Sequence, residues 1–304
     1  MPKMTGSRLF AEMMQGYGVT HVFYVPAIMK KAMIEMGPMG IRRIITHGEK
    51  SAAYMADGYA RASHRPGVCL AQGIGGSNLA AGLRDAYMAC SPIVAITGGP
   101  TPQGRYRYAY QEIEDISQFD PVTKFNACID SLPRMPDLLR QAFREATSGA
   151  PGPVHVQIPN PAGQLTEQEA ELDSVVEQDF GRVPAFRPEP EMERVRAAVG
   201  ELAKARKPVI VAGGGVVRSG AQREVVELAE KMQIPVITSL CAKGVILDSH
   251  PLAVGVSGTY SRACANSTLL EADLVFYIGC HASGQTTHSW RFPPSGTPVI
   301  QLDI

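Results

Sequence analysis

Short apolar runs alternate with longer helical patterns along almost the whole chain. Apolar runs at residues 21–25, 68–71 and 93–97 predict buried strands, and apolar periodicity over 49–63 and 75–90 predicts helices between them. Strands joined through helices of this length pair in parallel, because each connection returns the chain to the same edge of the sheet. The alternation therefore predicts an α/β protein with doubly wound parallel sheets.

The alternation is interrupted once, at residues 161–189. This stretch is acidic, contains proline and has little apolar periodicity, so we expect a linker there. It separates a predicted domain at 1–160 from a second at 190–304. A length of 304 residues suits two domains at about 150 residues each.

Composition excludes several classes of protein. The chain has 29 Lys+Arg and 29 Asp+Glu, so no basic excess is available to neutralise nucleic-acid phosphates, and 45% apolar residues argue against disorder. No apolar run reaches the ~18 residues of a membrane span, and the N-terminal segment is amphipathic rather than a secretory leader. Six scattered cysteines without a C-x-x-C pair predict free thiols in a reducing cytoplasm.

The segment from His47 to Arg61 carries the most information about function. Glu49 lies at the predicted start of the 49–63 helix, directly after a strand. The helix dipole favours a negative charge there, so the simplest interpretation from the residues alone is a carboxylate that stabilises the helix. Small residues along the helix predict a closely packed neighbour.

Four motifs, in order, resemble the thiamine-diphosphate enzymes of the acetolactate synthase and pyruvate oxidase-like superfamily. The first motif is E-x-x-A-x-x-x-A-D-G-Y-A-R from Glu49, and the second is G-I-G-G-S-N-L from Gly73, followed by S-P at 91–92. The third is Y-Q-E from Tyr110, followed by P-V-T-K from Pro121, and the fourth is G-P-V-H-V-Q-I-P from Gly152. Residues 190–304 resemble the central domain of the same enzymes. The resemblance implies a pyrimidine-binding domain followed by a Rossmann-like central domain.

The resemblance gives Glu49 a specific role. In the family, this carboxylate hydrogen-bonds N1′ of the cofactor's aminopyrimidine, and the enzymes decarboxylate a 2-oxo acid and join the product to an acceptor, so the implied class is a transferase or lyase. The family's glutamine near the reacting centre corresponds to Gln111. The implied cofactor contacts are Glu49, Pro26, Gly73, Gly75, Gly76 and Asn78, and the implied substrate pocket contains His47, Ala27 and Tyr110.

Simpler interpretations stay open for several of these residues. His47 suits a structural strand end, and Asn78 suits a helix cap. Turn geometry alone would explain the glycines after the 68–71 strand. The alternating tyrosines at 106, 108 and 110 suit a pocket lining or loop packing equally.

Two departures from the family pattern affect the substrate and the nucleotide. Tyr24-Val25-Pro26-Ala27 stands where relatives have G-x-P-G, so the substrate is not carried over. Residues 278–284 lack the Arg-Asp-Asp-Arg element of flavin-binding acetolactate synthases, which argues against FAD and leaves ADP or no nucleotide.

A third departure concerns metal binding. The family's G-D-G…N motif, whose Asp and Asn hold Mg²⁺ and the cofactor diphosphate, has no match in 1–304. We therefore expect no metal ligands in this chain, an absent C-terminal domain, and no activity of the chain alone. The Mg²⁺ site would come from a longer enzyme or a partner chain, and the assembly would be a homodimer, a tetramer or a pair of unlike subunits.

Three other functions remain in view. A 2-oxo acid decarboxylase of the same superfamily would share every motif. A non-catalytic scaffold or subunit would keep the fold and lose the cofactor. A nucleotide-binding module would use Gly213-Gly214-Gly215, which follows a predicted strand, although the full G-x-G-x-x-G pattern is missing.

Overall fold

The first parallel sheet has six strands in the order β3-β2-β4-β5-β7-β6. The computed structural model describes residues 2–26, 28–100, 104, 106–114, 116–159 and 165–304. Contacts divide the chain into two units, Met1–Phe186 and Arg187–Ile304. The strands of the first sheet are β2 (His21–Tyr24), β3 (Arg42–Ile45), β4 (Gly67–Ala71), β5 (Ile93–Gly99), β6 (Asn126–Cys128) and β7 (Pro153–Pro159).

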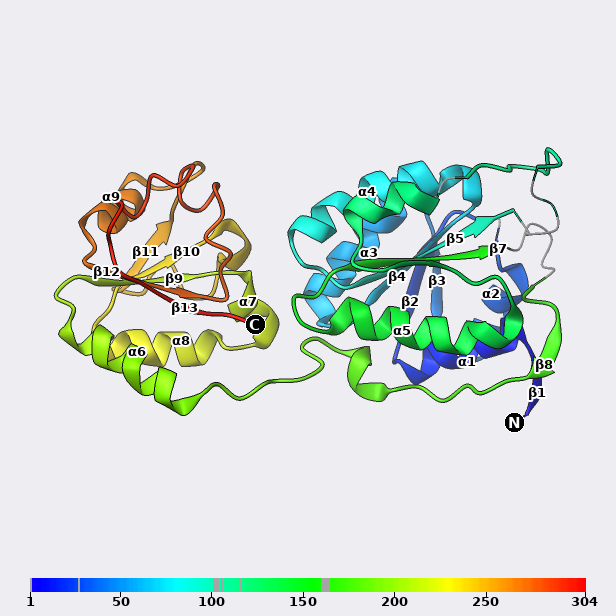
Figure 1. Ribbon diagram of the computed structural model, residues 1–304, viewed down its shortest axis with the longest axis horizontal. Coiled ribbons are helices and arrows are strands. Elements are labelled where there is room, and N and C mark those ends of the chain that lie inside the picture. Colours follow the sequence, from blue (N-terminus) through cyan, green and yellow to red (C-terminus); the bar gives the residue numbers. More distant parts are fainter. Residues whose placement is uncertain (1, 27, 101–103, 105, 115, 160–164) are drawn as a thin grey trace. The chain divides into compact units, whose positions relative to one another are not determined.

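Helices cover both faces of this sheet (Figure 1). One face packs against α1 (Gly6–Gly16), α2 (Lys30–Met36) and α5 (Met135–Thr147), and the other against α3 (Glu49–Ser63) and α4 (Gly76–Met88). All its strand pairs are parallel, as the alternating sequence pattern predicts. The prediction of a doubly wound parallel sheet is confirmed.

The packing of α3 against α4 depends on small residues. Ala52, Ala53 and Ala56 are fully buried along α3. A Cβ on Gly82 of α4 would lie 2.6 Å from the Cβ of Ala53 and 2.9 Å from the carbonyl oxygen of Lys50. The two helices therefore approach one another as closely as a bare glycine Cα permits.

The second unit is also a parallel, doubly wound structure. Its sheet has the order β11-β10-β9-β12-β13. The strands are β9 (Pro208–Ala212), β10 (Val236–Thr238), β11 (Ala253–Val256), β12 (Leu274–Ile278) and β13 (Val299–Leu302). One face packs against α6 (Met192–Lys204), α7 (Gly214–Ser219) and α8 (Gln222–Met232), and the other against α9 (Ala263–Glu271).

The described part of the predicted linker packs on the first unit as far as Phe186. Strand β8 (Glu169–Glu171) pairs antiparallel with β1 (Lys3–Thr5). Leu172 and Phe180 are buried in the core of the first unit. We call residues 165–186 the strap. It differs from a free linker because several of its apolar residues, such as Leu172 and Phe180, are buried in the core.

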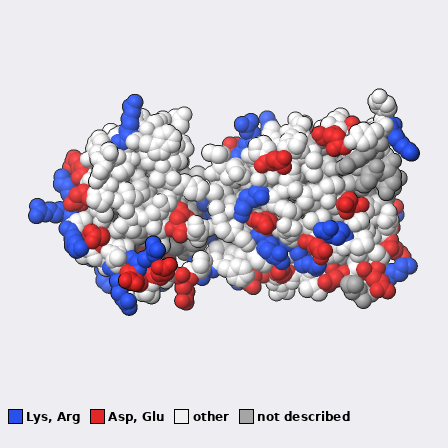
Figure 2. Space-filling view, viewed as in Figure 1, with Lys and Arg blue, Asp and Glu red and all other residues white. Residues whose placement is uncertain are grey.

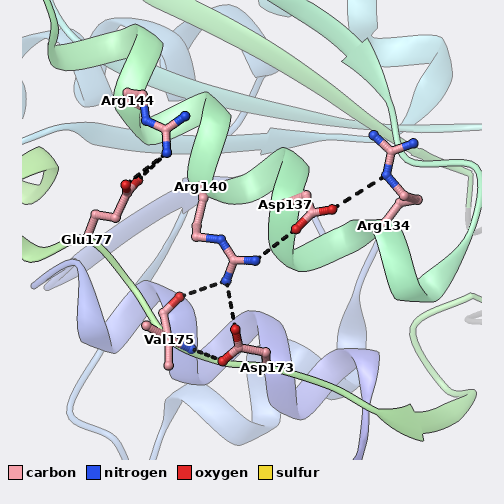
Figure 3. A network of polar contacts seen from close by, with 7 residues as sticks. All are labelled: Arg134, Asp137, Arg140, Arg144, Asp173, Val175 and Glu177. Atoms are coloured by element: carbon pink, nitrogen blue, oxygen red, sulfur yellow. Dashed lines mark hydrogen bonds and ion pairs between the residues drawn. The ribbon is translucent and has the colours of Figure 1, made fainter. Parts of the chain in front are cut away.

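Acidic residues of the strap face the arginines of α5 (Figure 3). Arg140 donates to Asp173 at 3.5 Å and to the carbonyl oxygen of Val175 at 3.0 Å. Arg144 donates to both carboxylate oxygens of Glu177 at 2.8 Å. Two of the acidic residues that suggest a solvated linker, Asp173 and Glu177, are therefore paired with basic side chains on the neighbouring helix.

Replacing Arg140 with Met should lower the free energy of unfolding of the first unit by about 1 kcal/mol, because the strap loses two of its hydrogen bonds. Urea unfolding and limited proteolysis within the strap measure the change. Arg194→Met is a matched control, since Arg194 pairs with Glu191 at the surface of the other unit. Equal effects of the two substitutions would contradict the anchoring role.

His155 is a fully buried histidine in β7, and both of its ring nitrogens are hydrogen-bonded. The side-chain nitrogen of Asn126 donates to Ile116 and Asp120, so its Oδ1 accepts from Nδ1 of His155 at 2.7 Å. Nε2 then accepts from the hydroxyl of Thr97 at 2.8 Å. Phe119 stacks on the ring at 3.6 Å between centroids. The imidazole is therefore held neutral.

Burial lowers the pKa of His155 to about 3, against about 6.5 in an unfolded chain. The unfolded state thus binds more protons between these values, and the free energy of unfolding falls as the pH is lowered, by up to about 1.4 kcal/mol per pH unit. Urea unfolding between pH 7 and pH 4 should show a shallower dependence in His155→Gln than in the wild type. Identical slopes would show that His155 does not carry this dependence.

Charges of both signs are mixed on the surface. On the face drawn in Figure 2, Lys and Arg lie among Asp and Glu on each unit. This mixture matches the balance of 29 basic and 29 acidic residues. Within the part of the chain that the structure describes, no helix is both long and apolar enough to cross a bilayer.

Candidate functional site

The candidate site lies at the carboxyl edge of the first sheet. Parallel strands end at a common edge, and there β2 leads to Pro26, β3 to Glu49, β4 to Gly73 and β5 beyond Gly99. The neighbouring strands β2 and β4 connect to helices on opposite faces, because α2 and α4 belong to different layers. Ligands of doubly wound proteins bind outside the strand ends at such a switch point.

Glu49 is the first residue of α3. The preceding turn is fixed by Thr46, a buried residue whose hydroxyl donates to the carbonyl oxygens of Gly48 at 3.0 Å and Tyr24 at 3.3 Å. Glu49 is half-buried, and its carboxylate lies at the positive end of the α3 dipole. The local structure therefore brings a carboxylate to the sheet edge in a fixed position.

Two groups from the β4–α4 connection contact this carboxylate. The side-chain amide of Asn78 donates to Oε2 of Glu49 at 3.2 Å. A Cβ on Gly75 would lie 2.5 Å from Oε1 and 2.6 Å from Cδ, so a side chain there would displace the carboxyl group from its present position. Among the residues that the structure describes, no Lys or Arg forms an ion pair with Glu49. Its charge is thus not neutralised by a neighbouring cation.

Backbone contacts bring Gln111 next to the glycine turn at 73–75. A Cβ on Gly73 would lie 3.5 Å from the carbonyl oxygen of Gly98 and 3.9 Å from that of Gln111. Gly98 in turn faces the side chain of Ile28, which follows β2. Gln111 is half-buried and has a φ of 59°. The ends of β2, β4 and β5 and the Gln111 turn therefore meet in one place.

Glu112 shapes the loop that carries Gln111, a role that the sequence analysis did not assign. Its carboxylate accepts from the N–H of Ala109 at 2.9 Å and from the N–H of Tyr106. The backbone N–H of Ala109, followed by that of Tyr106, holds the pKa of Glu112 below its usual value. The only signal in the sequence is that Glu112 follows Gln111 in the same motif.

The alternating tyrosines point into solvent in this structure. Tyr106, Tyr108 and Tyr110 are 87%, 100% and 77% exposed. Tyr106 and Tyr108 both have positive φ values.

The remaining predicted site residues differ in burial and in local structure. Pro26 and His47 are exposed in turns, and Gly76 is buried at the start of α4. Ala27 lies outside the described residues. Within those residues, no group of three or more His, Cys, Asp or Glu side chains is placed to hold a metal ion.

The triple glycine of the second unit is used in packing. Gly213 and Gly215 donate their N–H groups to the carbonyl oxygens of Ile278 and Gly279 at 2.8 and 2.9 Å. A Cβ on Gly215 would lie 2.7 Å from the Cα of Gly279. The β9–α7 turn therefore lies directly against the end of β12, and these two amides are engaged with protein rather than directed at a phosphate.

Comparisons with known proteins agree with this arrangement. Residues 4–119 match the family model of the thiamine pyrophosphate enzyme N-terminal TPP binding domain, and residues 195–304 match that of the thiamine pyrophosphate enzyme central domain. The chain is 34% identical to a probable acetolactate synthase large subunit of Methanocaldococcus jannaschii over 99% of this chain and 51% of that protein.

Two bacterial relatives give the same result. Identity is 32% to an acetolactate synthase of Arthrospira platensis, over 99% of this chain and 53% of that protein. Identity is 31% to the acetolactate synthase isozyme 1 large subunit of Escherichia coli, again over 99% of this chain and 53% of that protein. The chain thus spans about half the length of the curated relatives it matches.

Proposed function

The chain belongs to the family of thiamine pyrophosphate enzymes, and from this we propose that it forms part of an acetolactate-synthase-like enzyme that decarboxylates a 2-oxo acid and joins the product to an acceptor. The observation that carries the proposal is the position of Glu49, whose carboxylate lies at the switch point between Gly75 and Asn78 without a cationic partner among the described residues.

The residues around Glu49 fit thiamine diphosphate. A half-buried carboxylate can share a proton with a ring nitrogen, and the absence of a side chain at Gly73 and Gly75 lets a flat ring approach the backbone. When bound, the cofactor supplies the carbanion chemistry that breaks the bond to the carboxyl group of a 2-oxo acid. We propose Glu49, Pro26, Gly73, Gly75, Gly76 and Asn78 as the residues of this wall.

We assign the protein's contribution to proton transfer and positioning. Glu49 exchanges a proton with the pyrimidine ring and holds the ring in one orientation. Gln111, brought beside Gly73 by the Glu112-organised loop, is the second catalytic residue of the proposal. His47, Ala27 and Tyr110 are the proposed substrate-facing residues, and their role depends on what covers this edge of the sheet.

The proposed enzyme needs groups beyond those described here. We propose domains at 1–160 and 190–304, with Mg²⁺ and the cofactor diphosphate held by a further part of the protein or by a partner subunit, in a dimer or tetramer. The missing Arg-Asp-Asp-Arg element supports an enzyme without FAD. The six scattered cysteines, without a C-x-x-C pair, support a cytoplasmic location.

One assay tests the proposal and separates its alternatives. The full-length protein with thiamine diphosphate, Mg²⁺ and pyruvate is monitored for CO₂ release, acetolactate and acetaldehyde. We expect CO₂ together with acetolactate. Acetaldehyde without acetolactate would make the protein a 2-oxo acid decarboxylase. The absence of both CO₂ release and cofactor binding would identify a non-catalytic scaffold.

A further inference from the structure

Asn78 and Glu49 belong to the first turns of two different helices, α4 and α3. The amide of Asn78 donates to one carboxylate oxygen, Oε2, at 3.2 Å. The other oxygen, Oε1, lies over the bare Cα of Gly75. The two oxygens of Glu49 are therefore not equivalent, because Oε2 accepts a hydrogen bond from Asn78 and Oε1 lies beside Gly75.

We propose that Asn78 is a positioning residue that acts through Glu49 and does not itself bind the cofactor. Its amide fixes the plane of the carboxyl group, so that Oε1 is the oxygen that exchanges a proton with the pyrimidine ring. This inference rests on the proposed function, and it replaces direct cofactor contact by Asn78 with an indirect role.

The energetics favour this assignment. A glutamate side chain has three rotatable bonds, and a half-buried carboxylate without a fixed partner samples several orientations. The 3.2 Å hydrogen bond from Asn78 supplies such a fixed partner at Oε2. Asn78 itself is exposed in the first turn of α4, so its replacement removes the donor without opening a cavity in the core.

The experiment compares Asn78→Leu and Asn78→Asp in the full-length protein with thiamine diphosphate and Mg²⁺. Leu has nearly the shape of Asn without a donor, and Asp has the same shape with a negative charge. We expect kcat to fall about 10- to 100-fold in Asn78→Leu, and further in Asn78→Asp, because a second carboxylate repels Glu49. A purely structural role would make the isosteric Asp the milder change.

Cofactor affinity is the readout that does not depend on turnover. Titration calorimetry with thiamine diphosphate at saturating Mg²⁺ should give a Kd within about threefold of wild type for Asn78→Leu, because the lost interaction acts on catalysis rather than on binding. Ser77→Ala, an exposed neighbour in the same turn, serves as the control and should match wild type in kcat, Kd and melting temperature.

Three outcomes would overturn the proposal. A rise in Kd that matches the fall in kcat would show direct contact between Asn78 and the cofactor. A milder effect of Asp than of Leu would show that shape rather than the donor matters. Full turnover in Glu49→Gln would remove the proposed function itself, and this result is separate from either failure of Asn78.

Discussion

Replacing Glu49 with Gln should lower kcat roughly 1,000-fold, while the fold and the melting temperature stay close to wild type. Gln has the shape of Glu and can still accept the hydrogen bond from Asn78, which in the wild type measures 3.2 Å to Oε2. An amide cannot exchange a proton with a ring nitrogen near neutral pH, so only the chemistry is lost. Steady-state turnover of a 2-oxo acid and thermal unfolding measure the two parts of this expectation.

The matched control for this substitution is Glu193→Gln. Glu193 is also an acidic residue in the first turn of a helix, α6, and it is exposed. Loss of its charge removes the same kind of favourable interaction with a helix dipole, about 0.3–1 kcal/mol. If the two variants behave alike, Glu49 only stabilises its helix, and the catalytic assignment is wrong.

Gly75→Ala should lower kcat about 100-fold through a contact rather than through backbone strain. The backbone of Gly75 has φ −82° and ψ −1°, which alanine adopts readily. The new methyl group would lie 2.5 Å from Oε1 of Glu49, however, and the carboxyl group would have to turn away from its present position. Turnover assays and a structure of the variant would show the displaced carboxylate.

Gly58→Ala is the appropriate comparison for Gly75→Ala. Gly58 lies within α3, and a Cβ there meets no atom within 4 Å. Alanine should stabilise the helix by about 0.5–1 kcal/mol and leave kcat unchanged. Turnover within a factor of about three in Gly75→Ala would mean that the carboxyl group tolerates a different orientation, and would count against the geometry assigned to the site.

The sequence predicts the elements that carry a strong periodic signal and misses those that do not. The bounds expected for the 49–63 helix agree with α3, because alanines at helical spacing form one buried stripe. Strand β8 is Glu-Ala-Glu and has no apolar signal, and its pairing with β1 is fixed by tertiary contacts. Helix α9 contains Asn, Ser and Thr, which are weak helix formers, and was likewise not predicted.

The site likewise has features that the sequence predicts and features that depend on tertiary contacts. Strand ends and family motifs are sufficient to place Glu49, Gly75 and Asn78 at one edge of a sheet. The hydrogen bond between Glu49 and Asn78 depends on how two helices pack, which no local pattern encodes. The strap shows the same limit, because the acidic residues of 165–186 suggest exposure until the arginines of α5 are seen beside them.

The glycine–alanine contact between α3 and α4 makes the candidate site sensitive to changes one helical turn away from its residues. Ala53 and Gly82 set the spacing of the two helices whose first turns supply Glu49 and Asn78. A single methyl group added at residue 82 would clash with Ala53 and with the backbone of Lys50, and would increase the distance between the two helices. A substitution at this buried contact could thus change the position of Glu49 relative to Asn78 without altering either residue.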